Sequence, residues 1–375
     1  MRRLFKRLQA RWGPAFQSDT GFIEAAFREI LGRNADLDGL THYRRVLQDG
    51  VGRTAVLLDI MRSEEFRATL QPVTSTLPDL RTLKPAQFSR AIDRTNGDSI
   101  PVFEAVSAAD FNWLEHAILG HGYYEKPGVW VLDVDADKRV VAEILAAFGP
   151  ARALELGCAA GAVLQCLLDY GVAAEGVEIS DMAVARAPEA VRSRIHHGDL
   201  LSLDLSRPAG AADQRRGYDL IFGLDVFEHL NPNRLEAYIV RLAELVDEGG
   251  FVFCNIPAFG DDPVFGTVFP LYLERWQQDA SAGRPFSTLH VDDLGYPIHG
   301  HLTWADANWW RERFERQGFR REIEIERALH AKYDRHMKLR SPARCAYFVF
   351  SKGDAGSRRE GVIRQITAER SRVTS

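Results

Sequence analysis

Hydrophobic residues recur at two different spacings along the chain, and this alternation predicts where strands and helices lie. From Ala151 onward, short apolar runs typical of buried strands are separated by segments whose apolar residues recur every three or four positions. Such regular exchange of strands and helices indicates a parallel sheet with helices on both faces. The predicted strands cover 153–156, 176–179, 194–196, 218–224 and 251–256, and the predicted helices cover 161–170, 181–187 and 232–246.

Later segments extend this α/β domain toward the C-terminus. Thr303 is placed to cap a helix, and Gly318 follows the last apolar residue of that helix, where a left-handed residue is favoured. The runs 319–327 and 344–351 predict two closing strands, and the basic segment 330–344 is interpreted as a loop between them. We therefore expect a doubly wound, seven-stranded, mostly parallel sheet within residues 103–352.

The segment 257–302, between the fifth strand and the helix after Thr303, is much longer than a usual strand-to-helix loop. We interpret it as a lid over an acceptor pocket. It is rich in aromatic residues, which either stack on a ring-shaped acceptor or form the core of the lid itself. It also carries His290, His299 and His301.

The first hundred residues are organised differently. Apolar residues at helical spacing predict a small all-α domain over 20–70, which a basic amphipathic segment over 1–19 precedes. Residues 71–102 are rich in Pro, Thr, Ser and Asp and predict a linker, and the polar residues 353–375 predict a flexible tail. The segment 1–19 is suited either to an anionic membrane surface or to docking on its own protein.

Composition narrows the functional classes. The chain has 375 residues and a formal net charge of −5, whereas nucleic-acid-binding domains are usually strongly basic, so we expect no nucleic-acid partner. Four scattered cysteines without a CxxC pair indicate a reducing, cytoplasmic location and neither disulfides nor zinc. No apolar run reaches the roughly 18 residues of a membrane span. Any membrane contact is therefore expected to be peripheral, at the inner face.

A glycine-bounded turn in the stretch ALELGCAAGAVLQ, residues 153–165, narrows the ligand class. Gly157 and Gly161 enclose three residues, so the middle glycine of a dinucleotide-binding G-x-G-x-x-G turn is replaced by Ala159. A phosphate-binding loop is excluded because its lysine is missing. The small residues of the turn permit close approach of a ligand that carries no phosphate there.

Acidic residues follow this turn at strand ends. Glu178 ends the second predicted strand, where its carboxylate is placed to accept hydrogen bonds from ribose hydroxyls. Asp199 comes directly after the third strand, where a carboxylate is placed to accept from an adenine amino group. The alternatives are a solvated strand end for Glu178 and a turn-forming residue for Asp199.

Taken in order, the turn and the stretches GVEIS, HGDL, YDLIFGLDVFEHL and LVDEGGFVFCNIP resemble the class I S-adenosylmethionine-dependent methyltransferases. The stretch DVFEHL…EGGF is similar to the family that includes ubiquinone-pathway O-methyltransferases and many sugar and natural-product enzymes. The resemblance covers residues 130–351 and implies S-adenosylmethionine as the cofactor. The residues that it implies for cofactor binding are Glu155, Gly157, Cys158, Gly161, Glu178, Ile179, Asp199 and Leu200.

Candidate catalytic groups follow the fourth strand. Asp225, Glu228 and His229 have the i, i+3, i+4 spacing that places side chains on one face of a helical turn. His229 is a candidate general base, and the trio is also a candidate site for a divalent metal, although the resembling family carries Glu where this chain has Asp225. The alternative is that Glu228 and His229 only brace the loop. His301 is a second candidate base.

The sequence therefore predicts methylation of a sugar, glycan or other small-molecule acceptor, and the basic segment 330–344 favours an anionic one. The alternative is a non-catalytic binding module. The stretch FREILGRNADLDGLTHYRRVLQDG…LLDIMRSEEF resembles a bacterial helical domain of unknown function, distantly similar to phycobilisome linker domains, that often accompanies glycan proteins. This resemblance implies a protein partner for the helical domain.

Overall fold

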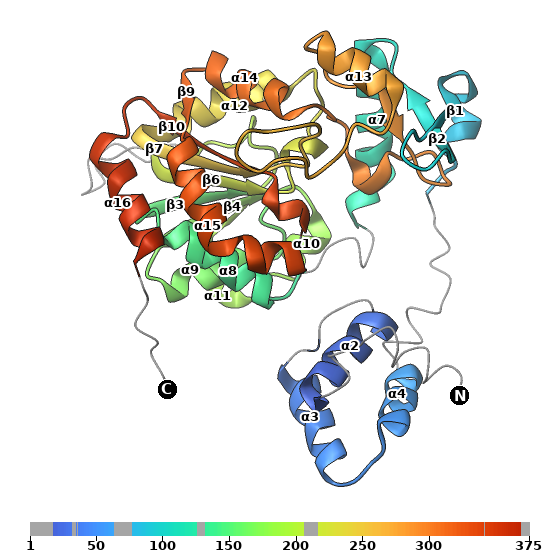
Figure 1. Cartoon of the computed structure of the whole chain (residues 1–375), viewed down its shortest axis with the longest axis vertical. Coiled ribbons are helices and arrows are strands. Elements are labelled where there is room, and N and C mark those ends of the chain that lie inside the picture. Colours follow the sequence, from blue (N-terminus) through green and yellow to red (C-terminus); the bar gives the residue numbers. More distant parts are fainter. Residues whose placement is uncertain are drawn as a thin grey trace. The chain divides into compact units, whose positions relative to one another are not determined.

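The computed structural model describes residues 18–31, 35, 37–63, 77–125, 132–205, 217–340 and 342–368 (Figure 1). The chain divides into two compact units, residues 1–76 and 77–375. The predicted basic segment 1–19 lies almost entirely outside the described residues. Within the described ranges, no helix combines the length and apolar character needed to cross a bilayer.

The described residues of the first unit form a cluster of helices. These are α2 (Asp19–Leu31), α3 (Leu37–Gln48) and α4 (Arg53–Arg62). Their apolar faces meet in one core that includes Phe22, Phe27 and Ile60. Arg53 donates to Asp19 at 2.7 Å, which ties the start of α4 to the start of α2. This unit confirms the predicted all-α fold at the N-terminus.

The second unit contains the predicted seven-stranded sheet, with strand order β5-β4-β3-β6-β7-β10-β9. The five strands from β5 to β7 run parallel, and β10 pairs antiparallel with β7 and β9. The fold class is confirmed. The strand bounds are β3 Arg152–Leu156, β4 Ala173–Glu178, β5 Ile195–His197, β6 Tyr218–Leu224, β7 Val246–Asn255, β9 Phe319–Arg321 and β10 Tyr347–Lys352.

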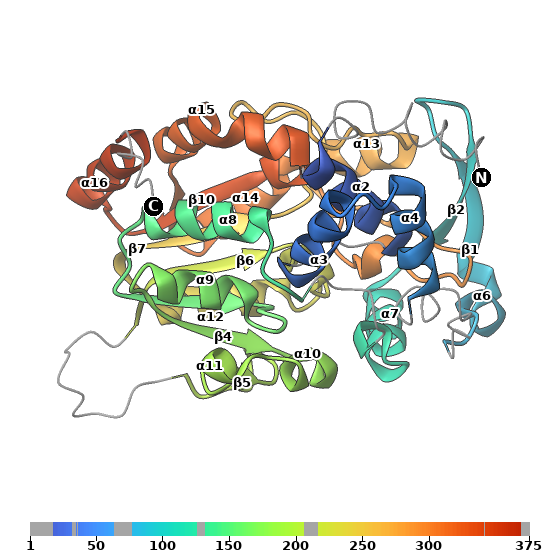
Figure 2. The same cartoon turned by 90° about the horizontal axis from the view of Figure 1, so that it is seen from below.

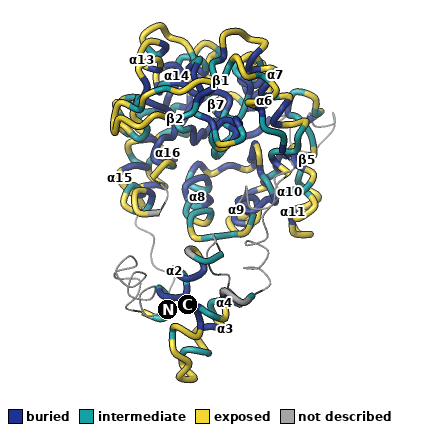
Figure 3. Tube along the Cα trace, turned by 90° about the vertical axis from the view of Figure 1, so that its right-hand side faces the viewer, coloured by how far each residue is buried: buried dark blue, intermediate teal, exposed yellow. Residues whose placement is uncertain are grey.

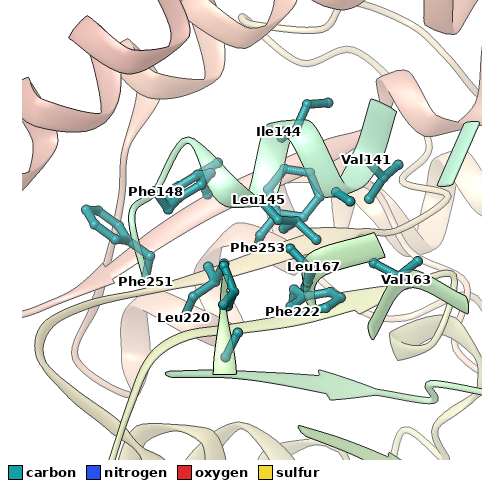
Figure 4. Packing of buried hydrophobic residues seen from close by; sticks show 14 of the residues in the cluster. Val141, Ile144, Leu145, Phe148, Val163, Leu167, Leu220, Phe222, Phe251 and Phe253 are labelled. Carbon is teal, nitrogen blue, oxygen red and sulfur yellow. The ribbon is translucent and has the colours of Figure 1, made fainter. Parts of the chain in front are cut away.

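Helices cover both faces of this sheet (Figures 1 and 2). One face packs against α8 (Ala136–Ala146), α9 (Ala162–Asp169), α15 (Ile323–Arg340) and α16 (Gly356–Thr367). Figure 4 shows Leu145 of α8 and Phe148, which follows this helix, packed over Phe222 of β6 and Phe253 of β7. The other face packs against α12 (Leu235–Leu245) and α14 (Ala307–Arg316).

The strand order reverses at β3. From β3 the chain winds outward through β4, α10 (Asp181–Ala185), α11 (Glu189–Arg192) and β5, and then returns to β6 on the other side of β3. All of β3 and nearly all of β6 are buried. Figure 3 colours buried residues dark blue, and they include the trace labelled β7 in the same sheet. Ligands of open α/β sheets bind at the carboxyl ends of the strands where the order reverses. The turn after β3 and the residues after β6 lie at this point.

A second, three-stranded sheet lies beside the first, with order β1-β2-β8 (Figures 1 and 2). Its elements are β1 (Phe88–Ile92), β2 (Ser99–Glu104) and β8 (Thr288–His290), with α6 (Leu80–Leu83), α7 (Ala108–Gly120) and α13 (Glu274–Ser281) packed on them. The prediction of a linker over 71–102 is therefore wrong for its described part. The overlooked signal is Asn96-Gly97, a common hairpin turn, which here joins β1 to β2.

The segment predicted as a lid packs with the second, three-stranded sheet. Phe259, Trp276, Phe286 and Tyr296 are buried in the same cluster as α7 and β2. Trp276 stacks on Phe286 with ring centroids 5.1 Å apart. The sequence left open whether these aromatic residues stack on an acceptor or form a core. The structure supports the second interpretation, because they are buried in a hydrophobic core.

The C-terminal predictions need four corrections. Only 319–321 of the predicted strand 319–327 is extended, because Ile325, Leu329, Tyr333 and Met337 recur every fourth residue and form the buried face of α15. The predicted loop 330–344 is therefore largely helix. The predicted flexible tail contains α16. The cap of α14 is Asp306, whose carboxylate accepts from the Trp309 N–H at 2.6 Å; the Thr303 hydroxyl instead donates to the carbonyl of residue 230.

Candidate functional site

The turn after β3 depends on backbone conformations that glycine allows. Gly157 and Gly161 have φ of 62° and 77°, and Ala159 between them has φ of 48°. A Cβ on Gly157 would lie 2.6 Å from Cγ2 of Val226, so this glycine also permits the close packing of the turn against the segment after β6. The turn leads directly into α9 and presents small groups to the carboxyl edge of the sheet.

Glu155 lies beneath this turn with an unsatisfied oxygen. The residue is buried in β3, and its Oε2 has no hydrogen-bond partner among the described residues. Burial, followed by the nearby Glu178, raises the pKa of Glu155 well above its usual range. A buried carboxyl oxygen without a donor is costly, so this position fits a cationic or N–H-bearing ligand group.

Glu178 is fixed at the end of β4. Its Oε2 accepts from the Ala159 N–H at 2.8 Å, and its Oε1 accepts from the N–H groups of Ile179 and Ser180, each at 2.8 Å. A carboxylate has about four lone-pair sites, so capacity remains for a ribose hydroxyl. Ile179 follows with 47% of its surface exposed, which suits an apolar side chain that packs on a ligand ring.

Two other residues predicted to bind the cofactor, Cys158 and Leu200, have buried side chains. The Cys158 side chain is buried toward β4, because a Cβ on Gly176 would lie 2.5 Å from Cys158 Sγ. Only the backbone of Cys158 can therefore face a ligand in the turn. Leu200 is buried in the core below α12.

Asp199 is engaged by the protein itself. Its Oδ2 accepts from Arg234 at 2.7 Å and from the Tyr238 hydroxyl at 2.8 Å, and its Oδ1 accepts from the Leu201 N–H at 2.9 Å. Arg234 and Leu201 are among the groups that hold the pKa of this carboxyl below its usual value, against the opposing effect of burial. Of the two interpretations from sequence, these contacts favour the turn-forming residue, with an added role in fixing α12.

A compact group of candidate catalytic side chains follows β6. Glu228 and His229 lie in the short helix η4 (Phe227–His229), and His301 follows the short helix η5 (Ile298–Gly300) in the predicted lid. Ligand atoms of these three residues lie within 4.8 Å of one another. The carbonyl of Glu228 accepts from the N–H groups of Leu302 at 2.7 Å and Thr303 at 2.8 Å. These two hydrogen bonds hold the end of the predicted lid, and with it His301, beside Glu228.

Burial controls the charge of this group. Glu228 is 1% exposed, and both its carboxyl oxygens lack a hydrogen-bond partner in the described part of the chain; Oε1 is 3.8 Å from His301 Nε2. Burial raises the pKa of Glu228, lowers the pKa of His229 to about 4 and lowers that of His301 well below its usual range. Both imidazoles are therefore neutral near pH 7 and carry a lone pair.

Tyr124 is a member of the site that sequence reasoning missed. Its hydroxyl lies 3.2 Å from His229 Nδ1 and 3.3 Å from the carbonyl oxygen of Gly300. The signal was present in GHGYYEKP, whose two tyrosines precede β3, the first strand of the large sheet, by some distance in sequence. Tyr123 stacks on Tyr296 with centroids 5.5 Å apart, so the pair fastens this segment between the lid and η4.

The predicted trio after β6 is therefore only partly assembled. Asp225 does not belong to the compact group; its place is taken by His301, which comes from the lid. Asp225 has φ of 54°, and its Oδ2 lies 4.0 Å from Arg344 Nε. Asp225 precedes η4 and has a left-handed backbone, so the predicted helical turn does not include it.

The basic segment 330–344 is more nearly neutral than the sequence indicated. Lys338 and His330 both contact Asp334, at 2.8 Å and 2.6 Å. Two further pairs reach α8: His336 with Asp137 at 3.1 Å, and Lys332 with Glu143 at 3.7 Å. Because the segment is helical, these acids from its own turns and from α8 lie within reach.

A family model for a methyltransferase domain matches residues 134–322, which is just over half of the chain. The chain therefore belongs to the methyltransferase family and is an S-adenosylmethionine-dependent enzyme. Glu155 and the turn after β3 fit this cofactor, because the buried Oε2 of Glu155 lacks a donor and the ammonium group of the cofactor is a donor. A model for a domain of unknown function, DUF4214, matches residues 9–70. No curated protein matches.

Solved structures with a similar fold include several methyltransferases. One is S-adenosylmethionine-bound CalS10, an amino pentose methyltransferase of Micromonospora echinaspora: identity is 19%, coverage is 63% of this chain and 96% of that one, and the TM-score is 0.36. Another is the 1,6-didemethyltoxoflavin-N1-methyltransferase of Burkholderia thailandensis, at 14% identity, 68% and 96% coverage and a TM-score of 0.40. Streptomyces venezuelae DesVI matches at 13% identity, 66% and 99% coverage and a TM-score of 0.37.

Proposed function

We propose that this methyltransferase methylates a hydroxyl oxygen of a sugar, a glycan or another small acceptor, and that the His229–His301 pair takes up the hydroxyl proton. The observation that carries the proposal is the group of two neutral imidazoles and one buried carboxyl at the carboxyl end of β6. The bound cofactor supplies an electrophilic methyl group. A neutral hydroxyl is a poor nucleophile, so a base near the acceptor raises the rate.

The residues divide the work on the acceptor side. As the bond from the acceptor oxygen to the methyl carbon forms and the sulfur–methyl bond breaks, the hydroxyl proton passes to an imidazole nitrogen. Glu228 stands 3.8 Å from His301 Nε2 and stabilises the imidazolium that results. Tyr124 contacts His229 Nδ1 and fixes the orientation of its ring. Glu228 and Tyr124 act through the imidazoles and are positioning residues.

On the cofactor side we propose that Glu155 accepts from the ammonium group of the methionine moiety and that Glu178 accepts from a ribose hydroxyl. The unsatisfied Oε2 of Glu155 and the remaining capacity of Glu178 support these roles. The glycine turn and Ile179 complete the proposed binding surface, with Ile179 against the adenine. We assign the adenine edge to backbone groups near Leu200, because the Asp199 carboxylate is engaged by Arg234 and Tyr238.

The helical unit is proposed to dock the enzyme on a partner protein. Its resemblance to a domain that accompanies glycan proteins supports this role and the choice of a sugar or glycan acceptor. Deletion of residues 1–76 tests it: we expect methyl transfer to a small acceptor to persist, because the second unit contains the whole proposed site. Loss of transfer with an intact fold of the second unit would contradict the docking role.

Methyl-labelled S-adenosylmethionine tests the proposed reaction. Full-length protein is incubated with an extract of the source cells, and the label is followed into small-molecule, glycan, protein and nucleic-acid fractions. We expect an alkali-stable methyl ether in the small-molecule or glycan fraction, and a much smaller signal from a His229→Asn/His301→Asn double variant. Label released by mild alkali as methanol, or found on nitrogen, would overturn hydroxyl methylation.

A further inference from the structure

We propose that Arg344 binds a carboxylate group of the acceptor and thereby selects acidic acceptors; this inference rests on the proposed function, because it concerns the acceptor side of the same site. Arg344 lies in the short helix η6 (Pro342–Cys345), directly before β10. Arg344 is not one of the residues proposed to take up the proton. Unlike His330 and Lys338 on α15, it has no acidic side chain within hydrogen-bond distance.

The fold places Arg344 at the ligand-binding edge of the sheet. Strand β10 runs antiparallel to β7, and Tyr347 at its start pairs with Asn255 at the end of β7. The side-chain amide of Asn255 donates to the carbonyl of Ala346 at 2.9 Å, which fixes the residues before β10 on the end of β7. Arg344 is thereby held beside Asp225, the residue that follows the neighbouring strand β6.

The guanidinium of Arg344 is poorly satisfied. Its side chain is 20% exposed, and its Nη1 is buried with no hydrogen-bond partner among the described residues. The nearest acid is Asp225, whose Oδ2 lies 4.0 Å from Nε, beyond hydrogen-bond length. A buried charged donor without an acceptor is unfavourable, and a guanidinium presents a planar edge that matches a carboxylate.

Four other basic side chains of the segment 330–344 already have acidic neighbours. On α15, His330 and Lys338 contact Asp334, and Lys332 and His336 contact acids of α8. Arg335 is exposed on α15. Lys138 of α8 donates to the Asp133 carbonyl and lies 3.9 Å from Asp135. Arg344 is therefore a partly buried cation without a close acceptor in the described part of this edge.

The neighbouring acid favours a carboxylate over a phosphate. Asp225 lies next to Arg344. One guanidinium balances a single negative charge, whereas a dianionic phosphate at pH 7 would leave more excess negative charge beside Asp225. An acceptor with one carboxylate, such as an acidic sugar or a hydroxy acid, fits this charge count.

Two variants at this pair are expected to act in opposite directions. Arg344→Gln removes the charge and should raise the KM for an acidic acceptor roughly 10- to 100-fold, with kcat changed much less; Arg344→Lys should recover part of the loss. Asp225→Asn removes the competing carboxylate and should lower the KM, and Asn tolerates the left-handed backbone at this position. A purely structural role for the pair would not give opposite signs.

The test separates the acceptor class from methyl transfer itself. In the first experiment, the full chain makes labelled products in source-cell extract, and the products are passed over a strong anion exchanger at pH 7 and again at pH 2. At pH 2 carboxylates lose their charge, whereas phosphates keep part of theirs.

In the second experiment, protein loaded with S-adenosylhomocysteine retains acids from the extract, and mass spectrometry measures them. The wild type is compared with Arg344→Gln and with the control Lys338→Gln, which breaks an exposed ion pair on α15.

We expect label that is held at pH 7 and released at pH 2, together with carboxylic acids retained by the wild type and by Lys338→Gln but lost in Arg344→Gln. Retention of such acids without any label would support the inference and contradict the proposed function. Label in neutral or phosphorylated products would overturn the inference while methyl transfer stands. Equal retention by the wild type and Arg344→Gln would also overturn it.

Discussion

The two halves of the proposed site are built in different ways. The cofactor half is made from one stretch of chain, the turn after β3 and the end of β4, and its Glu178 is held by backbone N–H groups. The acceptor half brings together Tyr124, Glu228, His301 and Arg344 from four distant segments. Its carboxyl and guanidinium groups lack partners. A shared cofactor needs a fixed site, whereas a particular acceptor is selected by groups that only the tertiary fold collects.

The largest effect is expected in the acceptor half. Replacing both His229 and His301 by Asn should lower kcat about 10²- to 10⁴-fold, because the acceptor hydroxyl loses its base. The affinity for S-adenosylhomocysteine, measured by calorimetry, should stay within about threefold because the cofactor half is untouched. Equal loss of kcat and of cofactor affinity would show that the two halves do not function separately.

The second-largest effect is expected on cofactor binding, from a variant in the cofactor half. Glu155→Gln should weaken the binding of S-adenosylhomocysteine roughly 10-fold or more, because a hydrogen bond to a charged group is lost. Glu189→Gln, an exposed residue of α11, is the matched control. Calorimetric titration of both variants checks the prediction. Unchanged affinity in Glu155→Gln would remove the proposed ammonium contact.

A third variant addresses the contact between the halves. Gly157→Ala should destabilise the protein and weaken cofactor binding, because the new Cβ would lie 2.6 Å from Val226 Cγ2 and the backbone φ is 62°. Adding Val226→Ala removes the clash and should recover part of the loss. Thermal unfolding of both single variants and the double variant measures this coupling. Strictly additive effects would mean that backbone strain alone explains the glycine.

The pH dependence follows from the buried imidazoles. The pKa of His229 is lowered to about 4, so the unfolded state binds more protons than the folded state between pH 6.5 and 4. Folding stability should therefore fall as the pH drops through this window, and His229→Asn should flatten the fall. The activity should persist down to about pH 5, since the base stays neutral. Loss of kcat centred near pH 6.5 would contradict the burial of His229.

The smallest effect is expected at Asp199. Asp199→Asn should lower the melting temperature modestly, because the ion pair with Arg234 is partly exposed and such pairs contribute about 1 kcal/mol or less. The affinity for S-adenosylhomocysteine should change less than about threefold. A large loss of affinity without a change in stability would restore the adenine role that the sequence predicted.

The local pattern of apolar residues predicted most of the fold. The period-two and period-four spacing of apolar residues predicted the five parallel strands and the helices between them. The prediction failed where one segment satisfies both the strand period and the helix period. The sequence Ile323-Glu324-Ile325 alternates as a strand does, yet Ile325, Leu329 and Tyr333 form a helical stripe that packs on the sheet. Burial against β7 and β10 decided between the two, and that contact is not visible in a short window of sequence.

The sequence by itself determined the glycine turn after β3 and the place of Glu178 at the end of β4, because these features follow one another within a short stretch and depend on backbone geometry. Only the tertiary structure decided the acceptor half. Two backbone bonds to the Glu228 carbonyl bring His301 to Glu228, and the antiparallel course of β10 brings Arg344 to Asp225. These residues carry no common spacing in sequence. Their proximity results from how the lid and the last strand pair with the edge of the sheet.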